Sequence, residues 1–417
     1  MKAARISIEL LSSGNSSSLV ITVFNEHPVI IPLKEHITLA NIDSYRQNFS
    51  EKILELQRFA GVKLYFNPAH SFDVLQKLHQ HGRTLLYRLF EREDITELSR
   101  IFQRALDFFN STQLLQHAHL IEIRHRDIWW IPFEYFPLLN MSEPVREESG
   151  NLMLVATRFI GFAALVRRVS TKPKVAKQSQ QPLNCDGKIT RDTKVPLRFF
   201  RNRSIPTAAS DEIFFSRLPD IELRNNWPSS RLSRETFIAE LGEQLYFAKD
   251  SRYAEQSIDA IVHFLCHCET NKVGHRYRMT LTQERPWYSR KFPPQTILVD
   301  ELYNYFSQCL ERDETKHYPL VFLNACGSGR ISPAQIDSFP QMFIDNRNRG
   351  VIGTETTIPT LLASAFAQSF YHSFFEGDSL AFCIQKAKWK IMENHNNPLG
   401  ILYTVYANPD LHISLKK

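Results

Sequence analysis

The stretch LVFLNACGSG, residues 320 to 329, is a short apolar run that ends on a single cysteine, Cys326, and then breaks at two glycines. Short apolar runs bounded by glycine are typical of strands that are buried on both faces of a parallel sheet. A cysteine directly after such a strand is either one more core residue or a nucleophile held at the edge of the sheet. The sequence on both sides of this stretch helps to distinguish the two.

The second half of the chain alternates strand-like and helix-like segments. AIVHFL (260–265) and RGVIGT (349–354) are apolar runs like the one before Cys326, and segments of helix length separate them. This order predicts an α/β fold with a mostly parallel sheet flanked by helices. In such sheets, ligands and chemistry gather beyond the carboxyl ends of the strands. His267 follows the first run, so His267 and Cys326 meet at one edge if their strands are neighbours.

The first half has a different pattern. Residues 1–33 hold three β-like runs, and a Ser/Gly/Asn turn between the first two predicts a hairpin. Apolar residues three and four apart predict helices over 44–60, 72–90 and 95–109. Residues 119–136 alternate in polarity, which predicts a second strand hairpin. This half contains no candidate catalytic pair.

Composition narrows the class of protein. The 417 residues exceed the usual size of a single core, so one large or two smaller domains are expected. The longest apolar stretch, 152–166, contains Arg158 and is shorter than the roughly 20 residues that cross a bilayer. We therefore expect no membrane span, and the first residues lack the pattern of an export signal. Six cysteines are too few for a disulfide framework, which predicts a cytoplasmic protein.

The positive charge is local. Residues 167–203 carry a net charge of +9, against +6 for the whole chain. Within this region, 170–188 is rich in Lys, Gln, Ser and Pro and has no periodicity, so we predict an exposed linker. No aromatic residues interleave with the charges of 170–188, which argues against a nucleic-acid contact. The predicted division is an N-terminal β-rich segment and lobe over 1–168, a basic linker over 169–194 and an α/β domain over 195–417.

The chemistry of a Cys–His pair explains why their meeting would matter. A thiol with a pKa of about 8.5 is little ionised at neutral pH, but an adjacent imidazole can take its proton and leave a nucleophilic thiolate. Gly327 and Gly329 would let the backbone turn past the sulfur, so that main-chain N–H groups could hold an oxyanion. A purely structural cysteine remains the alternative on these grounds alone.

The histidines and cysteines around His267 admit another interpretation, a metal site. Alternation along a strand puts Cys266 and Cys268 on one side and His263 and His267 on the other, so these side chains do not converge on one ion. We therefore predict no metal and no other cofactor. Cys266 is interpreted as a core residue. His263 lies four residues before His267 and is interpreted as a core histidine.

Several segments together resemble one protein family. IVHFLCHC and LVFLNACGSG are similar to the two catalytic motifs of CHAT domains, which are caspase-like cysteine proteases of the clan that also contains separases and metacaspases. GRTLLYRLF and IWWIPFEYF resemble landmarks of the front half of that family, 349–391 resembles the segment after its cysteine, and 397–413 its closing segment. The resemblance runs from about residue 80 to the end of the chain.

The resemblance implies a front half that is a catalytically silent caspase-like lobe and a rear half that carries the site. It makes His267 the general base and later acid, and Cys326 the nucleophile. The backbone N–H groups of Cys268, Cys326 and Gly327 would form the oxyanion hole. Family members usually have glycine where this chain has Cys268.

The resemblance also bears on the substrate pocket. Metacaspase-like relatives have an aspartate two positions before the nucleophile, where it recognises a basic substrate residue, and this chain has Asn324 there. We therefore predict cleavage that does not depend on a basic residue and accepts an apolar or small one. Glu355, Asp211 and Glu212 are further pocket candidates, although SDEIFF (210–215) also fits a helix start with Ser210 as the N-cap.

The function implied is a cytosolic cysteine endopeptidase that cleaves a protein substrate. We expect it to be latent until a separate activating or sensor protein switches it on, in prokaryotic antiviral defence or stress signalling. Two other classes stay open. One is a scaffold or binding module that kept the fold and lost activity, and the other is a cysteine hydrolase or acyltransferase that acts on a small substrate.

Overall fold

The computed structural model describes residues 5–13, 16–23, 26–37, 42–106, 119–124, 131–139, 145, 151–169, 188–191, 194–224, 232–246, 261–270, 277–281, 295–309, 319–325, 339–346 and 348–415. The strands are β1 (Arg5–Ser13), β2 (Ser16–Val23), β3 (Val29–Pro32), β4 (His119–Ile123), β5 (Ala164–Arg168), β6 (Lys188–Arg191), β7 (Val195–Arg201), β8 (Ile221–Arg224), β9 (Ile261–Thr270), β10 (Tyr277–Leu281), β11 (Gln295–Leu298), β12 (Leu320–Ala325), β13 (Gly350–Thr354), β14 (Tyr403–Ala407) and β15 (His412–Leu415). The helices are α1 (Ile42–Ala60), α2 (Pro68–Leu89), α3 (Arg92–Leu106), α4 (Leu152–Ala156), α5 (Ile160–Ala163), α6 (Ala208–Arg217), α7 (Arg234–Tyr246), α9 (Val299–Cys309), α10 (Phe339–Asp345), α11 (Thr360–Phe375) and α12 (Leu380–His395), with the short 3-10 helices η2 (Phe133–Tyr135) and η5 (Pro398–Leu402).

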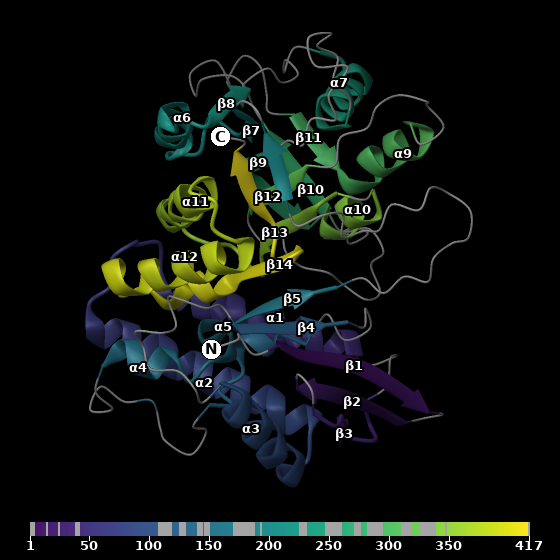
Figure 1. Cartoon of the computed structure of the whole chain (residues 1–417), viewed down its shortest axis with the longest axis vertical. Coiled ribbons are helices and arrows are strands. Elements are labelled where there is room, and N and C mark those ends of the chain that lie inside the picture. Colours follow the sequence, from purple (N-terminus) through teal and green to yellow (C-terminus); the bar gives the residue numbers. More distant parts are fainter. Residues whose placement is uncertain are drawn as a thin grey trace.

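One continuous sheet joins the two halves of the chain (Figure 1). Among the described strands its order is β11-β10-β9-β12-β13-β14-β5-β4-β1-β2-β3, and β7 and β8 add to it beside β9. The strands β8, β7, β9, β12 and β13 are parallel to their neighbours in that series, as are β14, β5, β4 and β1 in theirs. Within the described part of this sheet, antiparallel pairing is confined to β13–β14 and to the β1–β2–β3 and β9–β10–β11 ends. The predicted α/β class with a mostly parallel, helix-flanked sheet is confirmed.

Aromatic side chains pack the helices onto both faces of the rear part of the sheet. On one face, His263 of β9 contacts Phe215 of α6 and Tyr371 of α11. On the other face, Phe264 of β9 contacts Phe343 of α10. Because successive residues of a strand point to opposite faces, a central strand covered on both sides must be apolar throughout. This explains why β12 and the part of β9 up to Leu265 are nearly unbroken apolar runs.

The front half agrees with the sequence at its start and differs later. The β1–β2 hairpin is confirmed by antiparallel pairing such as Ile8 with Ile21, and α1 and α2 confirm the first two predicted helices to within one residue at their C-terminal ends. The third is confirmed by α3 up to Leu106, and the predicted residues 107–109 lie outside the described residues. The hairpin predicted for 119–136 is wrong over its described residues. There β4 pairs in parallel with both β1 and β5, and 133–135 form the buried 3-10 helix η2. All five residues of β4 are buried, so both faces of this strand are covered. An alternation of polar and apolar residues in the sequence predicts one exposed face instead.

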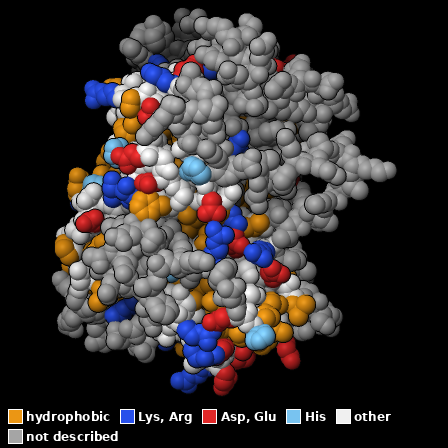
Figure 2. Space-filling model, viewed as in Figure 1, with side chains coloured by type: hydrophobic (Ala, Val, Ile, Leu, Met, Phe, Trp, Pro, Cys, Tyr) orange, Lys and Arg blue, Asp and Glu red, His pale blue; other side chains and the backbone are white. Residues whose placement is uncertain are grey.

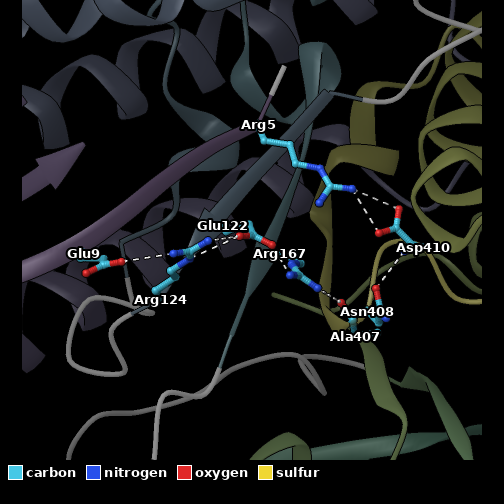
Figure 3. Close-up of polar contacts among 8 residues, drawn as sticks. All are labelled: Arg5, Glu9, Glu122, Arg124, Arg167, Ala407, Asn408 and Asp410. Carbon is cyan, nitrogen blue, oxygen red and sulfur yellow. Dashed lines mark hydrogen bonds and ion pairs between the residues drawn. The ribbon is translucent and has the colours of Figure 1, made fainter. Parts of the chain in front are cut away.

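Charged side chains reinforce the place where the two halves meet, between β5 and β14. Arg167 of β5 pairs with Glu122 of β4 and donates to the carbonyl oxygen of Ala407 at 3.3 Å (Figure 3). Arg5 reaches Asp410 at 3.1 Å in the same region. Acidic and basic side chains accordingly lie side by side across the middle of the face seen in Figure 2.

A second, fully buried charge cluster lies at the same joint. Arg168 of β5 forms an ion pair with Glu134 of η2, including a hydrogen bond of 3.0 Å. Lys388 of α12 donates to the carbonyl oxygen of Gly161 at 3.1 Å, and burial lowers the pKa of this lysine to about 8. The buried charge of Lys388 therefore joins the halves in addition to strand pairing, whereas the Arg168–Glu134 pair lies within the first half beside the joint.

The predicted linker lies largely outside the described residues, which resume at 188. Lys188–Arg191 form β6, which pairs in parallel with β15 in a separate two-stranded sheet. The division of the chain at this segment stays a prediction. None of the helices that the structure describes is long and apolar enough to cross a membrane.

Candidate active site

The strands that lead to His267 and Cys326 are neighbours, as the sequence analysis required. β12 pairs in parallel with β9 over six residues, from Leu320 opposite Ile261 to Ala325 opposite Cys266. Ala325 is the residue before Cys326 in the sequence, and Cys266 is the residue before His267. Cys326 and Gly327 themselves lie outside the described residues.

His267 lies inside a strand rather than after one. The apolar pattern ends at Leu265, but β9 continues to Thr270 because β10 pairs with its last four residues, with Thr280 opposite His267. The side chain of His267 is exposed. Strand β10, which lies between β9 and β11, thus extends the sheet past the point where β7 stops pairing with β9, and it holds the backbone of His267 in place.

The backbone of β9 determines which way the peptide group of Cys268 faces. The carbonyl oxygen of Leu265 accepts a hydrogen bond from the N–H of Asn202 at 2.7 Å, on the β7 side of the strand. Peptide groups alternate along a strand, so those of Cys266 and Cys268 face the β12 side. The side chain of Cys268 is 6% exposed and belongs to the core face opposite His267.

His263 is a core residue, in agreement with its interpretation from the sequence. It is fully buried, its Nδ1 lies 3.1 Å from the hydroxyl of Tyr371, and its ring stacks on Phe322. Burial lowers the pKa of His263 to about 3, which keeps the imidazole neutral at physiological pH.

Asn324 is held on both sides of its amide. Its Nδ2 donates to the carbonyl oxygen of Ala363 in α11 at 3.0 Å, and its Oδ1 accepts from the hydroxyl of Tyr403 in β14 at 2.9 Å. Asn324 is 3% exposed, and the ring of Tyr403 stacks on Phe366 with 3.6 Å between centroids. The side chain therefore ties the end of β12 to its surroundings.

The helix start at α6 differs from the expectation. The N-cap is Thr207, and Ser210 lies within the helix, where its hydroxyl donates to the carbonyl oxygen of Thr207 at 2.8 Å. Ser210 as the N-cap is therefore wrong. The chain already turns before this point, since the N–H of Ala208 bonds to the carbonyl oxygen of Ile205 at 3.0 Å.

The acids at 211 and 212 have different surroundings. Asp211 is buried, accepts hydrogen bonds from Ser364 and from Gln368 of α11, and has its pKa raised by burial. Glu212 forms an ion pair with Arg201 at 2.9 Å. Glu355 follows β13 directly, at the same edge as the ends of β9 and β12, and its N–H donates to Leu402 at 3.0 Å.

Arg201 and Tyr403 also belong to this region, although neither was predicted from the sequence. Arg201 was counted with the basic segment, although it ends the strand-like run VPLRFFR (195–201). A cation that closes an apolar strand is a signal that could have drawn attention to it. Tyr403 has no such signal, because its partner Asn324 is 79 residues away in the chain. Among the described residues, no three His, Cys, Asp or Glu side chains are grouped as metal ligands would be.

Two comparisons with individual proteins give partial matches. The chain is 29% identical over 204 residues to a protein of Vitiosangium sp. (strain GDMCC 1.1324) that is described as a probable protease, a match that covers 48% of this chain and 25% of that protein. Separase, in crystal structures of the Saccharomyces cerevisiae separase–securin complex, matches with a TM-score of 0.46 and 8% identity over 99% of this chain and 30% of that one. The chain thus spans about a quarter of the length of the curated relative.

The comparison with protein families covers most of the chain. Residues 82–410 match the model of the CHAT domain, a span that includes β9, β12 and every candidate residue described above. The chain therefore belongs to the CHAT domain family of caspase-like proteases.

Proposed function

We propose that this chain is a cysteine endopeptidase of the cytoplasm, in which Cys326 is the nucleophile and His267 is the general base and then acid. The observation that carries the proposal is the pairing of Ala325 with Cys266. Each of these residues immediately precedes one member of the dyad on neighbouring parallel strands. The family match and the protease description of the Vitiosangium protein support the same reaction class.

The proposed reaction forms an acyl-enzyme. His267 takes the thiol proton of Cys326, and the thiolate sulfur attacks the carbonyl carbon of the scissile peptide bond. When the C–N bond breaks, the imidazolium of His267 returns the proton to the departing amine, which leaves a thioester on Cys326. Water, deprotonated by His267, then attacks the thioester carbonyl, and the C–S bond breaks to release the acid and restore the thiol.

The proposed oxyanion hole consists of the backbone N–H groups of Cys268, Cys326 and Gly327. The direction of the β9 backbone supports the role of Cys268, because its peptide group faces the β12 side. The side chain of Cys268 is buried on the opposite face from His267, so a side chain in place of the family's usual glycine does not obstruct the space beside His267. This observation favours an active enzyme over a scaffold that has lost activity.

The surroundings of Asn324 support cleavage that does not depend on a basic residue. Both ends of its amide are engaged within the protein, by Tyr403 and by the backbone of Ala363. A neutral group in this state offers no charge to a substrate cation. We further propose that the enzyme is latent until a separate protein activates it, in antiviral defence or stress signalling. That part of the proposal rests on family membership.

The test compares new protein termini in cells that express the wild type and in cells that express Cys326→Ala. Termini that appear only with the wild type would identify both activity and cleavage site. Labelling with a thiol-reactive peptide electrophile gives a second measurement, expected at Cys326 and dependent on His267. The buried Cys266 is the matched internal control, because it should remain unlabelled. An inert Cys326 in the presence of an authentic activator would instead support a scaffold.

A further inference from the structure

Arg201 lies on the face and at the edge of the sheet that carry His267. It is the last residue of β7 and pairs with Leu265 of β9, which in turn pairs with Asn324 of β12. Leu265 and His267 are two residues apart on one strand, so their side chains point to the same face, and Arg201 shares it. From strand spacings, the Cα atoms of Arg201 and His267 are roughly 8 Å apart.

The guanidinium of Arg201 is buried with two of its nitrogens unpartnered. The residue is 1% exposed, and its Nη2 pairs with Glu212, which is 28% exposed on its side chain. Nε and Nη1 are buried and have no hydrogen-bond partner within the described part of the chain. A buried donor without an acceptor is costly, and more so when it is charged. Nε and Nη1 of Arg201 therefore need a hydrogen-bond acceptor, and a bound ligand can supply one.

The charges around Arg201 favour an anion as that ligand. Arg203 lies 3.9 Å from Glu212, so two cations share one carboxylate. The carboxyl group of Asp211 turns towards α11, where Ser364 and Gln368 donate to it, and burial raises its pKa towards the neutral form. Asn324 is neutral and already engaged. The excess charge of this part of the face is therefore positive.

We infer that Arg201 recognises the carboxylate of an acidic substrate side chain next to the scissile bond. This inference rests on the proposed peptidase function and adds a substrate class to it. A guanidinium and a carboxylate form strong, directional hydrogen bonds, and burial increases their strength. Glu212 holds one nitrogen of Arg201 in place and leaves the other two to the substrate.

The test measures binding apart from catalysis. Peptides from a positional library, in matched pairs that carry Glu or Gln at one position, are bound to the Cys326→Ala protein and followed by fluorescence anisotropy. At one position near the scissile bond, the Glu peptide should bind roughly tenfold more tightly than its Gln partner. Arg201→Met should abolish that ratio and leave the binding of the Gln peptide unchanged. Glu212→Gln should increase the ratio, since it removes the negative charge that partly neutralises Arg201 and keeps an amide oxygen that can still accept from Nη2.

Two control variants keep the result interpretable. Arg224→Met removes an arginine that also pairs with a glutamate, Glu222 on β8, and should preserve the ratio. Asp211→Asn should preserve it as well. If Arg201→Met lowers the melting temperature too far for binding to be measured, Glu212→Gln carries the test alone, because an unchanged ratio there contradicts the inference.

Two outcomes would overturn the inference and leave the dyad intact. One is equal binding of Glu and Gln peptides at every position, with cleavage still observed. The other is a preference for Lys or Arg that Asp211→Asn removes. Failure of the peptidase proposal would show differently, as an unreactive Cys326, and the binding ratios would still be measurable in that case.

Discussion

Tyr403 donates its hydroxyl hydrogen to the side chain of Asn324 across a distance of 2.9 Å, and Asn324 is the second residue before Cys326 in the sequence. The bond joins β14 to the end of β12, and the other end of the same amide is bound to the backbone of α11. Contacts from β14 and α11 thus hold the end of β12 in place. Tyr403 is a positioning residue for the nucleophile in the proposed mechanism.

Replacement of Tyr403 by phenylalanine should affect both stability and reactivity. The change leaves the buried Oδ1 of Asn324 without its donor, which should lower the free energy of unfolding by about 1 to 3 kcal/mol. It should also slow electrophile labelling of Cys326. Tyr305→Phe is the matched control, since that hydroxyl bonds to Glu243 at 2.6 Å between α9 and α7. An unchanged labelling rate in Tyr403→Phe would show that the bond is purely structural.

The proposed dyad predicts strongly non-additive effects. Cys326→Ala and His267→Ala should each abolish cleavage, and the double variant should be little worse, because the two residues act as a unit. Substrate turnover measures the effect. His263→Ala is the control, and it should impair stability more than chemistry, since His263 is fully buried. A well-folded but inactive His263 variant would mean that the base has been assigned to the wrong histidine.

The buried His263 should make stability depend on acidity. Burial lowers its pKa from 6.5 to about 3, so the unfolded chain takes up a proton below pH 6.5 that the folded chain does not. The contribution of this histidine is complete above pH 6.5 and is lost as the pH falls towards 3, at up to about 1.4 kcal/mol per pH unit. Chemical denaturation at pH 7 and pH 5 should show a smaller decrease in His263→Phe than in the wild type. Equal decreases in both proteins would contradict the assignment.

The sequence was sufficient where a local pattern determined the outcome. β9 and β12 could be predicted because each is a continuous apolar run followed by a residue with possible chemistry, and strands of this kind pair in parallel. The pairs that surround the site could not be predicted. Asp211 and Ser364 are 153 residues apart, and their contact depends on how α6 packs against α11. Ser210 was expected as a cap because Ser followed by acids is a typical helix start, yet the preceding turn begins the helix earlier.

The joint between the two halves of the chain leads to two predictions. The sequence predicts that residues 170–188 are exposed, and β6 begins at Lys188, so limited proteolysis should cut before that residue first. The two fragments should remain associated, because β5 of the first and β14 of the second belong to one sheet and Arg167 bonds to Ala407 across the joint (Figure 3). Gel filtration of the cut protein measures this association. Rapid separation would count against a single folded unit.

Glu134→Gln should weaken that association through Arg168, which lies in the same half as Glu134 and whose guanidinium is 5.7 Å from the centre of the ring of Tyr406 of β14, across the joint. It leaves Arg168 as a buried cation without its carboxylate, a change that typically costs about 3 to 5 kcal/mol, so the fragments should separate at a lower concentration of urea. Glu97→Gln is the matched control, because its ion pair with Arg100 lies on the surface of α3, where water screens the charges and the pair contributes little. If both variants separated at the same urea concentration as the wild type, the buried pair would have no effect on the joint, and strand pairing between β5 and β14 would have to be sufficient.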